Sequence, residues 1–248
     1  MKREIVVMSM LAACAWLCQA GCKEKPATPE PQPEDEASEE AESTEEATGE
    51  SAEAEEEATG EEEVEEAAEE EEVESEVIPK KVVMVIACKD FRDEELTEPK
   101  EILEEAGHKV TVASKKTGGC KGMKGLEYTP DMLVADIAVD EYDAMVFVGG
   151  TGAAAYYEDE EILDLVREAD DEGLIIGAIC LAPGILAEAG ILDGIDATAY
   201  DAEQARTALE EGGAEWTGED VTVDGVFVTA NGPEAATAFG EKLTELLK

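Results

Sequence analysis

Basic residues are scarce in this sequence. Eighteen Lys and Arg stand against 64 Asp and Glu, and the formal net charge is −46. Proteins that bind nucleic acid gain affinity when Lys and Arg displace counterions from phosphates, so this charge balance excludes nucleic acid as a partner. Acidic surfaces stay hydrated in salty surroundings, so the negative charge indicates a saline habitat and says nothing about activity.

Histidine is nearly absent, because His108 is the only one among 248 residues. It lies in EAGHKVTVAS, just before a predicted strand, where a structural or solvated role is expected. A cysteine–histidine protease needs an imidazole as the base beside its thiol. That mechanism and metal binding through His therefore both lack support, and we predict no metal and no cofactor.

A long hydrophobic run is also missing. IVVMSMLAACAWLC has fourteen residues and follows MKRE, a pattern typical of a secretory signal and too short for a comfortable transmembrane helix. It ends in QAGC, which resembles a bacterial lipobox with cleavage after Gly21 and a lipid on Cys22. Gln19 departs from that pattern, and LAAC, ending at Cys14, matches better locally but leaves a very short apolar region. An ordinary cleaved signal and an uncleaved anchor are the alternatives. Each of these predicts a cell-envelope protein outside the cytoplasm, and the lipobox predicts a lipid anchor in the membrane.

Aromatic residues are absent from residues 23–79, which hold 26 Asp and Glu against two Lys. Such a segment cannot bury enough apolar surface to offset its ordering entropy, and its charges repel one another. We predict a disordered tether here, with an acidic cation- or partner-binding tail as the alternative. The domain that follows, residues 80–248, keeps a net charge of about −23.

The cysteines do not form an evident disulfide framework. Cys14, Cys18 and Cys22 lie in the signal region, which leaves Cys88, Cys120 and Cys180 for the domain. An odd number leaves at least one thiol free or intermolecular. Cys88 is expected to be a small core residue or a resolving thiol for Cys180. Cys120 lies in the loop KKTGGCKGMKG and is expected to be exposed.

The domain alternates between two kinds of apolar pattern. Apolar, β-branched runs predict buried parallel strands, and amphipathic spacing predicts helices between them. The strands are expected over 81–87, 109–114, 141–150 and 174–180, with a late hairpin at 221–230. The helices are expected over 94–107, 159–173, 182–192 and 233–248. This order predicts an α/β sandwich with a mainly parallel sheet, whose site lies at the carboxyl ends of the strands.

The stretch AICLAPG, residues 178–184, follows the last predicted parallel strand. Small residues two positions before and after Cys180 permit a tight turn from strand to helix, as in the serine elbow of hydrolases. The start of the following helix favours a thiolate and lowers the pKa of the thiol. Cys180 is thus a candidate nucleophile, and a buried core cysteine is the alternative.

At this point the sequence resembles the ThiJ/PfpI family, which includes the parkinsonism-associated deglycase and the protease I-like proteins. GLIIGAICLAPGILAEAGIL resembles the cysteine elbow of the family, and KDFRDEELTEP resembles its first-strand loop, with Glu95 four residues before Pro99. FVGG resembles a Pro-Gly-Gly strand end, and DGVFVTANGPEAATAF resembles the last strand, loop and helix. The resemblance covers the whole domain and implies a flavodoxin-like, three-layer α/β sandwich, the class I glutamine amidotransferase-like fold.

The resemblance also implies roles for individual residues. Cys180 would be the reactive thiol, and Glu95 an acid that burial holds protonated beside it. The backbone of Gly149 and Gly150, with the amide of Leu181, would form an oxyanion pocket. Family members often dimerise, so a homodimer stays an open alternative.

Four positions depart from the family pattern. Leu181 stands where peptidase-like members carry His, which ranks peptidase activity last. Ala182 replaces a preferred Gly, Arg92 stands where many members have an acidic residue, and Asn231 stands where some have Arg. The first hypothesis is a cysteine-dependent hydrolase or lyase of small carbonyl compounds, similar to a glyoxalase or deglycase. The alternatives are a redox-responsive or chaperone-like stress protein, in which Cys180 is oxidised, and a non-catalytic binding domain.

Overall fold

The computed structural model describes residues 78–248. The expected signal, the lipidation site at Cys22 and nearly all of the acidic tether lie outside the described residues. Within residues 78–248, no helix is both long and apolar enough to cross a membrane.

The core of the domain is a seven-stranded sheet in the order β11-β12-β8-β7-β1-β3-β6. All neighbouring strands pair in parallel except β11 and β12. This confirms the predicted sandwich with a mainly parallel sheet. The central strands are buried on both faces, which explains their continuous apolar sequences. The strands of this sheet are β1 (Lys81–Val85), β3 (Lys109–Ser114), β6 (Met132–Leu133), β7 (Ala144–Phe147), β8 (Ile175–Ile179), β11 (Val221–Asp224) and β12 (Phe227–Ala230).

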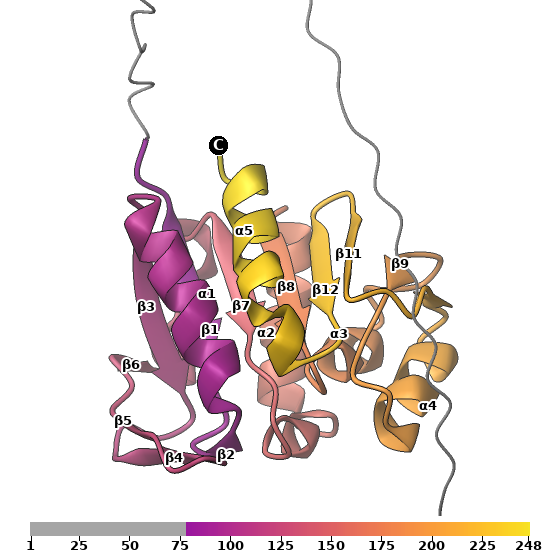
Figure 1. Ribbon diagram of the computed structural model, residues 1–248, viewed down its shortest axis with the longest axis horizontal. Helices are drawn as coiled ribbons and strands as arrows, with labels where there is room; N and C mark the ends of the chain where they lie inside the picture. Colours follow the sequence, from indigo (N-terminus) through magenta and orange to yellow (C-terminus); the bar gives the residue numbers. More distant parts are fainter. Residues whose placement is uncertain (1–77) are drawn as a thin grey trace, which may run out of the picture. The chain divides into compact units, whose positions relative to one another are not determined.

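Helices cover both faces of the sheet. Helices α1 (Asp93–Glu105) and α5 (Ala236–Leu246) pack side by side on the face toward the viewer in Figure 1, and α2 (Glu160–Asp171) and α3 (Pro183–Ala189) lie behind it. Helices α2, α3 and α5 fall within the ranges that the amphipathic patterns predicted, and α1 begins one residue before its predicted range. Pro233 belongs to a short 3₁₀ turn, Pro233–Ala235, that precedes α5. Further 3₁₀ turns span Val134–Asp136, Val139–Glu141 and Ala153–Tyr156.

Several elements were not foreseen from the sequence. The glycine-rich loop contains β4 (Cys120–Gly122), which pairs with β2 (Lys89–Phe91) and with β5 (Glu127–Tyr128) in a separate three-stranded sheet. Helix α4 (Glu203–Glu211) packs against α3, and β9 (Asp196–Ala197) pairs with β10 (Glu215–Trp216).

The cysteines differ from the expectation. Cys88 and Cys120 form a disulfide across a sequence separation of 32 residues, and Cys180 is the free cysteine among the described residues. Cys120 is fully buried and not exposed. Cys88 is therefore no resolving thiol for Cys180 in this structure. The pairing brings together residues that are distant in sequence, which a count of cysteines alone does not reveal.

Candidate active site

Cys180 lies at the turn between β8 and α3, in a backbone conformation that is unusual for a residue with a side chain. Its φ angle is 65°, in the left-handed region where residues other than glycine are strained. Two backbone hydrogen bonds hold this turn: the Cys180 N–H donates to Ala230 O at 2.8 Å, and the Cys180 carbonyl accepts from Tyr200 N–H at 2.8 Å. The cysteine elbow expected from the small residues around it is therefore present.

Glu95 lies beside Cys180, in the first turn of α1, and none of its surface is exposed. The absence of a side chain at Gly149 lets the side chains of Glu95 and Cys180 approach each other. A Cβ atom at Gly149 would stand 2.6 Å from Glu95 Oε2 and 2.6 Å from Cys180 Cβ, distances too short for any side chain. The glycine after β7 is thus required by the close packing of the site and is more than a turn residue.

The acidities of the two groups depend on each other. Burial raises the pKa of Glu95 to about 7, and the smaller effects of Cys180, the Arg92 charge and the Gly149 N–H act in the opposite direction. Neither carboxyl oxygen makes a well-aligned hydrogen bond with the described residues. A carboxyl group that is so poorly solvated favours its neutral form. The expectation that Glu95 is held protonated by burial agrees with this direction.

The thiol behaves differently from the expectation that the helix start lowers its pKa. Burial and the charge of Glu95 raise the pKa of Cys180 to about 12, while the amides of Gly150 and Leu181 act in the lowering direction. Two ionisable groups in contact titrate as a pair. The pair loses its first proton near neutral pH and retains the second to high pH. Over this range the remaining proton is held by the Cys180 thiol, and a thiolate forms only when that proton moves to Glu95.

The three predicted backbone donors divide between the two side chains. The N–H groups of Gly150 and Leu181 act on the Cys180 sulfur, and the N–H of Gly149 acts on the Glu95 carboxyl. Gly150 and Leu181 are thus placed to stabilise negative charge that develops next to the sulfur.

The loop before α1 supports these donors. Arg92 N–H donates to Gly149 O at 3.0 Å, and Gly152 N–H donates to Asp90 O at 3.0 Å. Gly150 has a φ of 97°, and a Cβ there would stand 2.5 Å from Asp90 O. The two loops therefore fix each other through the backbone.

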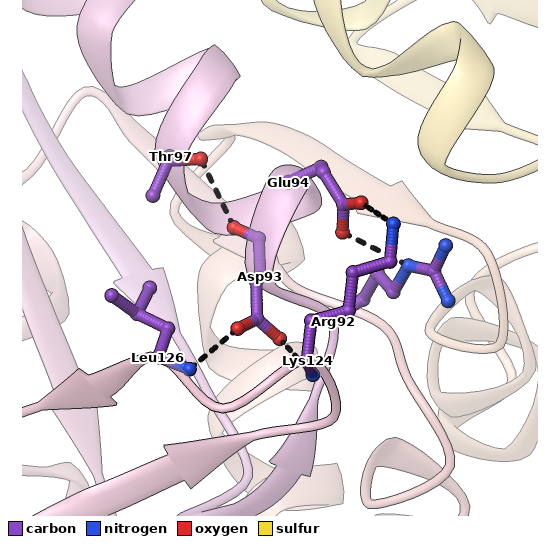
Figure 2. Close-up of polar contacts among 6 residues, drawn as sticks. All are labelled: Arg92, Asp93, Glu94, Thr97, Lys124 and Leu126. Carbon is purple, nitrogen blue, oxygen red and sulfur yellow. Dashed lines mark hydrogen bonds and ion pairs between the residues drawn. The ribbon is translucent and has the colours of Figure 1, made fainter.

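This loop is in turn tied to the segment that follows β4. Asp93 accepts hydrogen bonds from the backbone N–H groups of Leu126 (2.7 Å) and Lys124 (2.9 Å), as Figure 2 shows. The Cys88–Cys120 disulfide joins the same two segments covalently. A rigid support of this kind holds the Glu95 carboxyl in place.

A cleft of about 800 Å³ opens from Cys180. Residues that the sequence pattern did not single out form much of its wall. Trp216 lines the cleft, with Arg206 stacked 4.8 Å from its ring centre. Tyr200 also lines the cleft and is half exposed. The lining also includes Arg92, Glu95, Met123, Thr151, Thr198, Asp201, Asn231 and Glu234.

Tyr157 is a further residue that sequence reasoning missed. Its hydroxyl donates to Leu181 O at 2.6 Å, and a Cβ at Gly184 would collide with its ring. Tyr157 therefore positions the turn after Cys180. The glycine at 184, directly after Pro183, is the sequence signal for such a close approach.

His108 lies away from the site. It is buried before β3, where its Nδ1 accepts a hydrogen bond from Lys80 N–H at 3.3 Å, and burial lowers its pKa. Because β3 and β8 are parallel strands of one sheet, the start of β3 and the end of β8 lie at opposite ends of the strands. Within residues 78–248, no three His, Cys, Asp or Glu side chains come together as metal ligands.

The sequence pattern of the DJ-1/PfpI family matches residues 80–246. This chain belongs to the DJ-1/PfpI family. It is 42% identical over 169 residues to an uncharacterized protein of Methanocaldococcus jannaschii, covering 68% of this chain and 82% of the relative. It is 31% identical over 166 residues to "Deglycase PfpI" of Pyrococcus furiosus, covering 67% of this chain and 99% of the relative. The crystal structure of a ThiJ/PfpI domain protein from Brachyspira murdochii is similar, with a TM-score of 0.66 and 32% identity, covering 68% and 96% of the two chains. Membership of the family confirms the resemblance seen in the four sequence motifs.

Proposed function

We propose that this protein is a cysteine-dependent enzyme that acts on small reactive carbonyl compounds, as a glyoxalase or deglycase does. The observation that carries the proposal is the fully buried Glu95 carboxyl beside the Cys180 side chain, next to the backbone N–H groups of Gly150 and Leu181. The name of the Pyrococcus furiosus relative, a deglycase, supports the same reaction class.

The chemistry for a 2-oxoaldehyde begins when the proton of the Cys180 thiol moves to the Glu95 carboxylate. The Cys180 thiolate attacks the aldehyde carbon, and the amides of Gly150 and Leu181 stabilise the oxyanion. Glu95 then gives this proton to the oxyanion, and its carboxylate moves the proton on the former aldehyde carbon to the neighbouring oxygen-bearing carbon. This converts the hemithioacetal into a thioester. Water then cleaves the thioester and releases a 2-hydroxy acid. One carbon is oxidised and its neighbour reduced, so the reaction needs no external oxidant.

A peptidase mechanism has less support. Leu181 follows the cysteine, and the only histidine of the chain lies at the other edge of the sheet. No imidazole is therefore available to Cys180 as a base.

The test is the consumption of methylglyoxal and the appearance of lactate with the full chain. We expect turnover in the wild type, a loss of at least about a thousandfold in Cys180→Ser, and a similar loss in Glu95→Gln. Lys242→Gln, on the exposed side of α5, is the matched surface control and is expected to keep full activity. Turnover that persists in Cys180→Ser would refute the proposal.

The second candidate is a redox-responsive stress protein, favoured by one observation. Cys180 is the free thiol among the described cysteines, and a protonated Glu95 can donate a hydrogen bond to a sulfinate formed on it. Mass spectrometry after exposure to low peroxide tests this: stoichiometric addition of two oxygens to Cys180, without methylglyoxal turnover, favours the stress protein.

Location outside the cytoplasm is part of the proposal. The Cys88–Cys120 disulfide supports it, because disulfides persist in oxidising compartments. The lipid on Cys22 and the tether would hold the domain at a membrane surface, where it acts as a monomer or a homodimer. Labelling with radioactive palmitate, lost in Cys22→Ala, tests the anchor, and sedimentation analysis of the purified protein reports the oligomeric state.

A further inference from the structure

The cleft is larger than a small dicarbonyl compound requires. Its volume of about 800 Å³ lies within the range of sites that enclose drug-sized ligands. Methylglyoxal fills only a small part of it. The reacting carbonyl group is therefore expected to belong to a larger molecule, and the lining residues indicate what else that molecule carries.

Arg92 supplies a positive charge to the cleft, and the carboxylate that forms an ion pair with it is shared with a lysine. Its Nε lies 3.0 Å from Glu94 Oε2, but Glu94 also pairs with Lys124 through its other oxygen. One carboxylate thus faces two cations. Figure 2 shows the two terminal nitrogens of Arg92 directed away from Glu94. Within residues 78–248, no other carboxylate forms an ion pair with this guanidinium.

The position of Arg92 suits contact with a substrate bound at Cys180. It lines the same cleft as Cys180 and Glu95, and its positive charge acts on Glu95. Its backbone is fixed by the hydrogen bond to Gly149, and its side chain is only 25% exposed. A guanidinium held in this way presents a planar pair of donors, which matches the two oxygens of a carboxylate.

The other arginine of the cleft is already engaged. Arg206 pairs with Asp201 at 3.0 Å and stacks on Trp216. Among the residues that line the cleft, Arg92 is therefore the better anchor for an anion.

We propose that Arg92 binds a carboxylate at the far end of the substrate, so that the preferred substrates are 2-oxoaldehydes that carry a carboxylate. This inference rests on the proposed function. For 4,5-dioxopentanoate the reaction would add one water and yield 2-hydroxyglutarate and one proton. The aldehyde carbon becomes a carboxylate and the adjacent ketone becomes an alcohol, so electrons balance within the molecule.

The experiment compares 4,5-dioxopentanoate with its methyl ester, which lacks the negative charge, on the full chain. We expect the wild type to show a kcat/KM at least roughly tenfold higher for the acid than for the ester. Arg92→Gln is expected to remove this preference, so that kcat/KM for the acid falls at least roughly tenfold more than kcat/KM for the ester. Arg92→Lys is expected to keep part of the preference, because it keeps the charge but loses the planar donor pair. Lys242→Gln should keep all of it.

Two results would overturn the inference. One is a wild type that uses acid and ester equally well. The other is an Arg92→Gln variant that loses activity equally toward both, which would mean that Arg92 tunes Glu95 and does not hold substrate.

Failure of the proposed function gives a different pattern, in which neither probe nor methylglyoxal is consumed. In that case titration calorimetry of the Cys180→Ser protein with 4-oxopentanoate tests whether Arg92 binds a carboxylate. This probe has the carboxylate but no aldehyde. Binding that is lost in Arg92→Gln supports the carboxylate site, and absent binding or binding that Arg92→Gln leaves unchanged overturns it.

Discussion

The two walls of the site are built in different ways. The elbow (Ala178–Gly184) is held mainly by backbone hydrogen bonds to Ala230 and Tyr200, at the end of a buried strand. The acid wall (Cys88–Glu95 with Cys120–Leu126) is held by a disulfide and by the Asp93 side chain. The conformation of the elbow is therefore fixed by the strands of the main sheet. The acid wall depends on cross-links between segments that are distant in sequence, and its stability can be changed separately.

The largest expected effect concerns the disulfide of the acid wall. Replacing Cys88 and Cys120 by Ser releases a closed loop of 32 residues, which should lower the free energy of unfolding by about 4 kcal/mol. Urea denaturation measures this. Cys180→Ser is the control with the disulfide intact and should change stability by less than about 1 kcal/mol. A double variant as stable as the wild type would mean that the acid wall holds without its cross-link.

The next effect is a pH dependence that comes from Glu95. Its pKa of about 7 lies above the usual value of a glutamate, so folding favours the protonated form. The wild type should therefore lose about 3 kcal/mol of stability relative to Glu95→Gln as pH rises from about 4.5 to 7, and little more above that. Urea denaturation at a series of pH values measures the difference. A constant difference across this range would show that Glu95 is ionised like an exposed glutamate.

A smaller effect is expected where the two walls meet. Gly149→Ala places a Cβ against both Glu95 and Cys180, which should cost about 2 kcal/mol of stability and abolish turnover. Gly118→Ala is a matched control, because a Cβ there has no atom within 4 Å. Equal thermal stability of the two variants would contradict the close packing of the walls.

The smallest effect is expected from the hydrogen bond by which the Tyr157 side chain holds the elbow. Tyr157→Phe removes the hydroxyl that donates to Leu181 O and should lower stability by about 1 kcal/mol. The matched control is Tyr142→Phe, whose hydroxyl contacts only the sulfur of Met132, a weak acceptor. A loss near that of the disulfide variant would show that the elbow also relies on side-chain ties.

The same contrast explains what the sequence could predict. The strands around the elbow have continuous apolar runs, and small residues flank Cys180, so local patterns were sufficient there. The disulfide and the contacts of Asp93 join segments about thirty residues apart, and no local pattern records such a pairing. Glu95 was found only through the family resemblance, since its own surroundings in the sequence are those of a solvated acidic helix.

The far part of the cleft was missed for a different reason. Helix α4 buries mainly alanines, Ala205 and Ala208 with Leu209, so its apolar period is faint. Strands β9 and β10 have two residues each, too few for a recognisable alternation. Trp216 and Arg206 come from these elements, and for this reason their place in the cleft became clear only in three dimensions.

The left-handed backbone of Cys180 has a consequence for how this domain can change over generations. Glycine adopts that conformation without strain, so a single substitution of Cys180 by glycine would make the turn easier to form. The cysteine thus carries a backbone strain that glycine would not carry at this position. A descendant that does not use the thiol can relieve this strain by one substitution. A thiol at this turn is therefore expected to persist only where selection maintains its reactivity.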